Sequence, residues 1–103
     1  MAEITLTTEN FQEEVLESQV PVLVDFWATW CGPCQMMGPV VEELANQSDG
    51  SYKVGKVNVD EQGELAQKYG IMSIPAFYVF KDGNIHASTI GAQSKDALLA
   101  LLK

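Results

Sequence analysis

The chain has 103 residues, 47% of them hydrophobic, which is enough for one domain with a buried core. No stretch is long and apolar enough to cross a bilayer, and a net charge of −8 opposes binding to nucleic acid or to an anionic membrane surface. The two cysteines, Cys31 and Cys34, leave none for a structural disulfide framework, which suits a reducing compartment. Because the polar start at Met1 has no signal-peptide pattern, we expect a cytoplasmic protein with a single domain over residues 1–103.

The first elements predicted are a short strand and a helix. Ile4 and Leu6 alternate with polar residues, as they would in an edge strand. Thr7 or Thr8 can cap the helix that follows. The apolar residues on one face of that helix are Phe11, Val15 and Leu16.

Residues 21–27 form an almost continuous apolar run that is rich in valine. This pattern is typical of a central strand that is buried on both faces and has parallel neighbours. Asp25 interrupts the run, and an unpaired carboxylate buried there would cost several kcal/mol or would take up a proton, so burial should raise its pKa. We interpret Asp25 as a functional residue, the alternative being a structural role near a strand end.

The sequence Cys31-Gly32-Pro33-Cys34 lies between this strand and a helix predicted over residues 35–46. The first N–H groups of a helix lack intrahelical partners and the helix dipole is positive there, so a thiolate is favoured at Cys31. Cys34 follows one turn later, where the two sulfurs can form a disulfide. Pro33 suits a first helical turn, and Gly32 allows close backbone approach. Because the thiolate is the attacking species in thiol–disulfide exchange, this spacing predicts a redox site in which one cysteine attacks and the other resolves.

A lone pair of cysteines at this spacing can also be half of a zinc site. A structural zinc needs about four ligands, and beyond the cysteines the chain offers His86, its one histidine. His86 falls on the last predicted strand, where we interpret it as an exposed residue. We therefore expect no metal site.

The helix over residues 35–46 contains Pro39, which should remove one hydrogen bond and kink it. Residues 52–59 alternate as a strand, which can only join parallel to the earlier strand after an intervening helix. A right-handed βαβ unit follows. The apolar residues assigned to the helix are Met36, Met37, Val40, Val41 and Leu44.

The remaining elements are a helix, a hairpin and a closing helix. Residues 64–69 form a short helix stopped by Gly70, and a loop over residues 71–75 leads into a strand over 76–80. Asp82-Gly83 is a hairpin signal, so the strand over 85–90 should be antiparallel to its predecessor. The closing helix is capped by Ser94 and carries Leu98, Leu101 and Leu102.

These motifs resemble the thioredoxin family. The active-site signature is matched by Val24-Asp25-Phe26-Trp27-Ala28-Thr29-Trp30-Cys31-Gly32-Pro33-Cys34. Further matches, which extend the resemblance over nearly the whole chain, are Pro39, Lys56, Asp60, Ile74, Pro75, Gly83 and Gly91. The resemblance implies an α/β thioredoxin fold, with a central mixed five-stranded sheet flanked by four helices.

The resemblance also implies site roles. Asp25 would accept the proton of Cys34, and Lys56 would neighbour this aspartate on the adjacent strand. The Ile74–Pro75 peptide bond would be cis and face the cysteines, so that the Ile74 backbone pairs with an extended substrate segment. An apolar docking rim round Cys31 would consist of Trp30, Ile74 and Gly91. We interpret Trp27 as a core residue.

The implied activity is thiol–disulfide exchange that reduces disulfides in cytoplasmic proteins. A separate thioredoxin reductase, a flavoprotein that uses NADPH, would recharge the chain, which would act as a monomer with no cofactor of its own. Gln35 stands where many family members have lysine, and Ser73 and Ala76 replace a common glycine and threonine; these departures bear on redox potential and partner preference. Two alternatives remain open: an oxidant or isomerase of an oxidising compartment, and a binding subunit that uses its apolar rim without the thiols.

Overall fold

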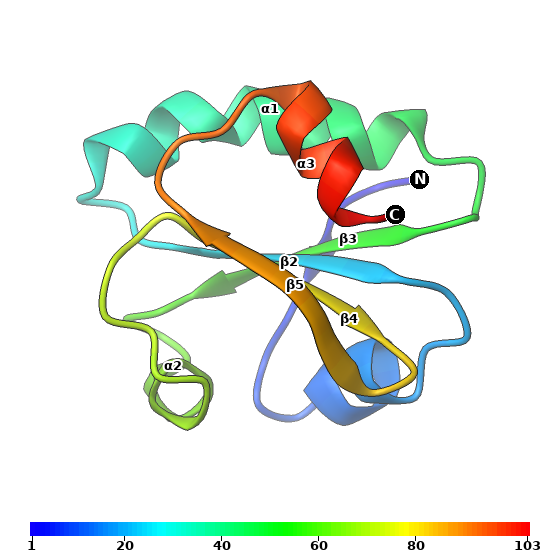
Figure 1. The fold of residues 1–103 in the computed structure, drawn as a ribbon. Helices are drawn as coiled ribbons and strands as arrows, with labels where there is room; N and C mark the ends of the chain where they lie inside the picture. The colour runs from blue at the N-terminus through cyan, green and yellow to red at the C-terminus, as the bar shows by residue number, and fades with distance from the viewer.

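A mixed five-stranded sheet forms the centre of the computed structural model, which describes residues 1–103 (Figure 1). The strand order is β1-β3-β2-β4-β5. The elements in chain order are β1 (Ile4–Thr5), the π-helix η1 (Gln12–Leu16), β2 (Val22–Trp27), α1 (Gly32–Gln47), β3 (Lys53–Asn58), α2 (Gly63–Lys68), β4 (Ala76–Lys81), β5 (Asn84–Ile90) and α3 (Lys95–Leu101). The predicted sheet with four helices is confirmed.

The central strand is β2, as its apolar run predicts. It pairs in parallel with β3 on one side and antiparallel with β4 on the other. The expectation of parallel neighbours is therefore wrong for β4. The chain enters β4 at Ala76, which pairs with Phe26 near the end of β2, so β4 has to run back along its neighbour.

Two hydrophobic cores lie on opposite faces of the sheet. In Figure 1, α1 and α3 cover the upper face, while α2 and η1 cover the lower face. Alternation along β2 sends Leu23 into the core with α1 and α3, whereas Val24 and Phe26 enter the core with η1 and α2. By the same alternation Asp25 lies on the α1 side of β2.

The N-terminal segment differs from its prediction in detail. Strand β1 ends at Thr5, and Leu6 lies beyond it, although Leu6 is buried and its N–H donates to the Lys56 carbonyl. The Thr7 hydroxyl accepts a hydrogen bond from the Asn10 N–H at 3.2 Å in the turn before η1. The N-cap of η1 itself is Phe11, which makes no side-chain capping bond, so the predicted cap at Thr7 or Thr8 is wrong. The helix then widens into a π-helix, in which the Glu17 N–H donates to the Gln12 carbonyl. A single turn holds too few residues for its apolar spacing to distinguish the two helix types.

Helix α1 begins at Gly32, three residues before its predicted start, because Pro33 belongs to its first turn. Of the apolar residues assigned to it, Met37, Val41 and Leu44 are buried. Met36, which also lies on this helix as expected, is 76% exposed. None of the helices is long and apolar enough to cross a membrane.

The hairpin joining β4 to β5 turns at Asp82 and Gly83, whose φ angles are 52° and 79°. Two successive positive φ angles suit the right-handed twist of the strands, and Asp-Gly tolerates them best. A bulge in β5 opposite Val79 and Phe80 leaves His86 unpaired and exposed. The Ser94 hydroxyl accepts a hydrogen bond from the Ala97 N–H at 3.1 Å, which confirms the predicted cap of α3.

We predict that Gly55→Ala destabilises the protein by about 1–3 kcal/mol, because its Cβ would overlap a packed core side chain. Gly55 is buried in β3, and a Cβ there would stand 2.7 Å from the Cγ of Leu6, which is only 1% exposed. The measurement is urea denaturation of the oxidised protein.

Gly38→Ala is the matched control. Gly38 lies inside α1 with nothing within 4 Å of an added Cβ, so alanine should stabilise the protein by about 0.5–1 kcal/mol through helix propensity. A Gly55→Ala protein as stable as the parent would contradict the packing argument.

Candidate active site

The site forms where the chain passes from β2 into α1. After Trp27 the backbone turns through Thr29 and Trp30, both exposed, to Cys31, the N-cap of α1. Cys31 is extended, with φ −89° and ψ 112°, and its Sγ accepts a hydrogen bond from the Cys34 N–H at 3.2 Å. An N–H group that no carbonyl satisfies is thus directed at the sulfur, an arrangement that favours negative charge on it.

Cys31 and Cys34 form a disulfide, with their Cα atoms 5.2 Å apart. Their exposed fractions are 5% and 4%, so exposure does not distinguish the two cysteines. Both sulfurs lie against buried Ala28, whereas Gly32 and Pro33 between them are exposed. The sulfurs differ in their partners, since only Cys31 caps the helix.

The loop before β4 faces the disulfide. The Ile74–Pro75 peptide bond is cis, and the Ile74 carbonyl oxygen lies 3.9 Å from Cys31 Sγ. This is a contact rather than a hydrogen bond, because a disulfide sulfur carries no proton. Gly91, with φ +93°, donates its N–H to the Pro75 carbonyl at 2.7 Å and so joins the end of β5 to this loop.

Large apolar side chains are exposed close in sequence either to the disulfide or to Ile74, which faces it. Trp30 is 69% exposed, and its Nε1–H donates to Asp60 Oδ2 at 2.8 Å, which fixes the indole orientation. Met36 lies two residues after Cys34, and Met72, two residues before Ile74, is 95% exposed. Sequence patterns single out neither methionine, because Met36 is one of several apolar residues on its helix and loop residues carry no periodic signal.

Asp25 is buried on the α1 side of the sheet. It is 2% exposed, and its Oδ1 has no hydrogen-bond partner. Burial raises the pKa of the Asp25 carboxyl to about 7, against the opposing effect of the Lys56 ammonium and with a smaller contribution from the Glu3 carboxylate. The predicted direction of the pKa shift is confirmed.

Lys56 pairs in register with Asp25 on the adjacent strand, so the two residues are neighbours as the resemblance implied. They do not form a salt bridge. The Lys56 Nζ instead lies 4.5 Å from the centroid of the Trp27 ring, where the π electrons attract it. Trp27 is half-buried and so both packs and holds this cation.

Glu3 is a charged residue that sequence analysis did not select. It is half-buried, and its Oε2 is buried without a hydrogen-bond partner. Burial raises the pKa of Glu3, the Lys56 charge lowers it, and the Glu42 charge raises it. A cavity of about 340 Å³ lies beside these groups and is lined by Glu3, Trp27 and Lys56 among others. The position of Glu3 depends on the pairing of β1 with β3, which are distant in sequence, and no local sequence pattern predicts it.

No group of three or more His, Cys, Asp or Glu side chains is arranged to hold a metal ion. The sulfurs are joined to each other, and His86 lies on β5 at the bulge. The chemistry available at the site is therefore that of the dithiol and of Asp25.

Comparison with known proteins gives a consistent result. The family model described as "Thioredoxin" matches residues 2–103. The chain is 46% identical over 99 residues to thioredoxin of Pseudomonas aeruginosa, covering 96% of this chain and 92% of that protein. It is 51% identical over 98 residues to thioredoxin 1 of a Nostoc species, covering 95% and 92%. It is 53% identical over 93 residues to thioredoxin 1 of Synechococcus elongatus, covering 90% and 87%.

We predict that Asp25→Ala gains stability relative to the parent as the pH rises. The folded-state pKa of about 7 exceeds the ordinary value of 3.8, so the native state binds this proton more tightly than the unfolded chain. The contribution of Asp25 to native stability therefore falls as the pH rises from about 4 to about 7, by about 4 kcal/mol for a shift of roughly three units. Asp25→Ala has no carboxyl at this position, so it does not lose this stability as the pH rises.

Urea denaturation of the oxidised proteins at about pH 4 and pH 8 measures the effect. The cavity left by alanine lowers the free energy of unfolding by the same amount at both pH values. The change with pH in the stability difference between Asp25→Ala and the parent therefore reports the carboxylate alone. A difference that does not depend on pH, or a variant no more stable than the parent at pH 8, would contradict the prediction.

Proposed function

Because this chain belongs to the thioredoxin family, we propose that its Cys31–Cys34 pair reduces disulfides of cytoplasmic proteins and is itself recharged by a thioredoxin reductase. Because the chain belongs to this family and has the paired cysteines, it is a thiol–disulfide oxidoreductase with protein-disulfide reductase activity. Members of this family in general act on disulfide substrates and have a thioredoxin reductase as partner. The observation that carries the proposal is a disulfide at the N-terminus of α1, facing the Ile74 carbonyl.

In the first step the Cys31 thiolate attacks one sulfur of a substrate disulfide. A mixed disulfide forms between Cys31 and that sulfur, and the second substrate sulfur leaves with the bonding electron pair and takes a proton from water. The N–H of Cys34, directed at Cys31 Sγ, supports Cys31 as the nucleophile because it stabilises the thiolate.

In the second step Cys34 passes its proton to Asp25 and attacks the sulfur of Cys31. The Cys31–Cys34 bond forms, the bond between Cys31 and the substrate breaks, and the substrate leaves as its second thiolate. A pKa of about 7 supports Asp25 as the base, since such a group accepts protons near neutral pH. Lys56, in register beside it, offsets the charge of its ionised form.

Substrate docking uses the backbone of the loop before β4. An extended segment that pairs with the backbone at Ile74 would bring its disulfide to Cys31, since the Ile74 carbonyl lies 3.9 Å from that sulfur. Exposed Gly32 and Pro33 leave the approach open. The surrounding rim of Trp30, Ile74 and Gly91, extended by Met36 and Met72, offers apolar contact that suits many sequences.

The chain acts as a monomeric single domain over residues 1–103, with no bound cofactor, and receives its electrons from the reductase. Use of both cysteines in the redox pair supports a cytoplasmic setting, because no structural disulfide is exposed to reduction there. The charge of −8 supports a freely diffusing carrier.

We predict that Cys31→Ser abolishes reduction of a model protein disulfide, whereas Cys34→Ser still attacks and stops as a mixed disulfide. The reason is that only the sulfur at position 31 receives the capping N–H. Mass spectrometry of each variant after incubation with the substrate decides the order of attack. Equal trapping by the two variants would contradict it.

We predict that Trp30→Ala raises KM for a protein disulfide about fivefold, which is equivalent to losing about 1 kcal/mol of contact. The rate with a small aromatic disulfide should stay close to that of the parent, because such a substrate does not span the rim. Steady-state assays with both substrates measure the effect.

The matched control is Ile85→Ala, which removes a side chain that is 50% exposed at the hairpin end of β5, away from the disulfide. Its KM should equal that of the parent. Equal effects of the two substitutions would show that Trp30 takes no part in docking.

A further inference from the structure

Two side-chain atoms in the protein are buried without a hydrogen-bond partner, Glu3 Oε2 and Asp25 Oδ1, and both are carboxylate oxygens beside the same cation. We propose that Glu3 is a positioning residue for proton transfer at Cys34, because it shares the charge of Lys56 with Asp25 and so favours the protonated form of Asp25. This inference rests on the proposed role of Asp25 as the base for Cys34.

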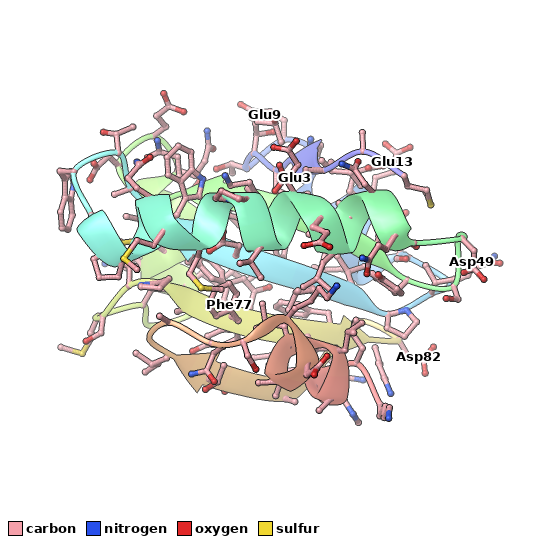
Figure 2. All side chains as sticks on the ribbon, turned by 90° about the horizontal axis from the view of Figure 1, so that it is seen from above. Glu3, Glu9, Glu13, Asp49, Phe77 and Asp82 are labelled. Atoms are coloured by element: carbon pink, nitrogen blue, oxygen red, sulfur yellow. A yellow bond between two sulfur atoms is a disulfide. The ribbon has the colours of Figure 1, made fainter.

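Strand register places Glu3 and Asp25 on either side of Lys56. Lys56 pairs with Asp25 of β2 on one side and with Thr5 of β1 on the other. Residues two apart in an extended chain lie on the same face, so Glu3 follows Thr5 to the face of Lys56 and Asp25. Helix α1 covers this face, and Figure 2, viewed from above, shows Glu3 alongside α1.

The charges of this group do not balance. With both carboxylates ionised, Glu3 and Asp25 carry two negative charges against the single positive charge of Lys56. Lys56 forms a salt bridge with neither, since its ammonium lies over the Trp27 ring. Buried like charges oppose each other's ionisation, so a negative Glu3 makes Asp25 a stronger base.

Access to solvent differs between the two carboxylates. Glu3 lines the cavity of about 340 Å³ together with Lys56, whereas Asp25 is 2% exposed and does not line it. The cavity is polar enough to hold water, so Glu3 can titrate with the solution. The ionisation of Glu3 then alters the basicity of Asp25 without transfer of a proton between the two carboxyls.

The other titratable or charged groups around this pair come from several elements. Glu42 of α1 raises the pKa of Glu3, and Glu61 from the loop after β3 lines the cavity. Cys34 of α1 is bound to Cys31 in the oxidised protein and does not titrate there. The Met1 ammonium donates to the carbonyls of Ala45 and Ser48 at the far end of α1.

The test is titration of the Asp25 carboxyl carbon by NMR in the oxidised, full-length protein. Glu3→Gln, which removes the charge and keeps the side-chain length, should lower the pKa of Asp25 by about half a unit, a threefold change in its dissociation constant. Glu3→Asp keeps the charge and should restore most of the parent value. Glu61→Gln, which changes another carboxylate of the same cavity, should leave the Asp25 titration unchanged.

An Asp25 titration that is unchanged in Glu3→Gln, or shifted equally by Glu61→Gln, would overturn the proposal. If Glu3→Gln fails to fold, the parent decides: the Asp25 resonance should show a second, smaller step as Glu3 titrates, and a single step would overturn the proposal.

The pH profile of mixed-disulfide resolution separates this inference from the proposed function. In Glu3→Gln the profile should move to lower pH together with the Asp25 titration. A shifted titration with an unmoved profile would overturn both roles, because Asp25 would not then be the base for Cys34. An unshifted titration, with a parent profile that still follows Asp25, would overturn the role of Glu3 alone.

Discussion

The site depends on direct passage of the backbone from the most buried strand of the sheet into the first turn of α1. Residues 22–26 of β2 are all buried and held by hydrogen-bonded strands on both sides, so the end of β2 has little freedom to move. The adjoining turn places Cys31 as the N-cap of α1, where an N–H of the helix is free to meet its sulfur. Rigidity comes from the sheet, and reactivity from the helix end.

Strand β2, which leads into the disulfide turn, also carries a group whose burial opposes folding, the carboxyl of Asp25. Leu23, Val24 and Phe26 stabilise the sheet by burial, whereas Asp25 between them lacks a hydrogen bond to Oδ1. A carboxylate in that position persists only if something other than stability favours it, and the proton transfer proposed for Cys34 is such a requirement. The shared cation at Lys56 reduces the cost without removing it, because the ammonium lies toward Trp27.

Much of the fold follows from local patterns. Three features depend only on residues that are close together in sequence, and each is found where expected. They are the valine-rich run of β2, the Asp82-Gly83 turn and the Ser94 cap. The paired cysteines are predictable in the same way. The family resemblance supplied the cis peptide bond and the neighbourhood of Lys56, which local chemistry could not.

The features that escaped prediction depend on contacts between distant segments. Glu3 acquires its environment only when β1 pairs with β3, which brings Thr5 into register with Lys56, 51 residues further along the chain. The sequence marks Met36 as an apolar residue of α1, but only the packing of α1 on the sheet shows that this side chain is exposed. The antiparallel direction of β4 likewise follows from where the loop after α2 delivers the chain, since strand composition does not record direction.

The outer strands of the sheet have a consequence for self-association. On one side β1 pairs over only two residues, and on the other β5 contains the bulge at His86. Short or bulged edges are poor templates for the strands of another copy, and the charge of −8 adds mutual repulsion. Neither outer edge of the sheet therefore favours the formation of intermolecular sheets, although the protein exposes an apolar rim.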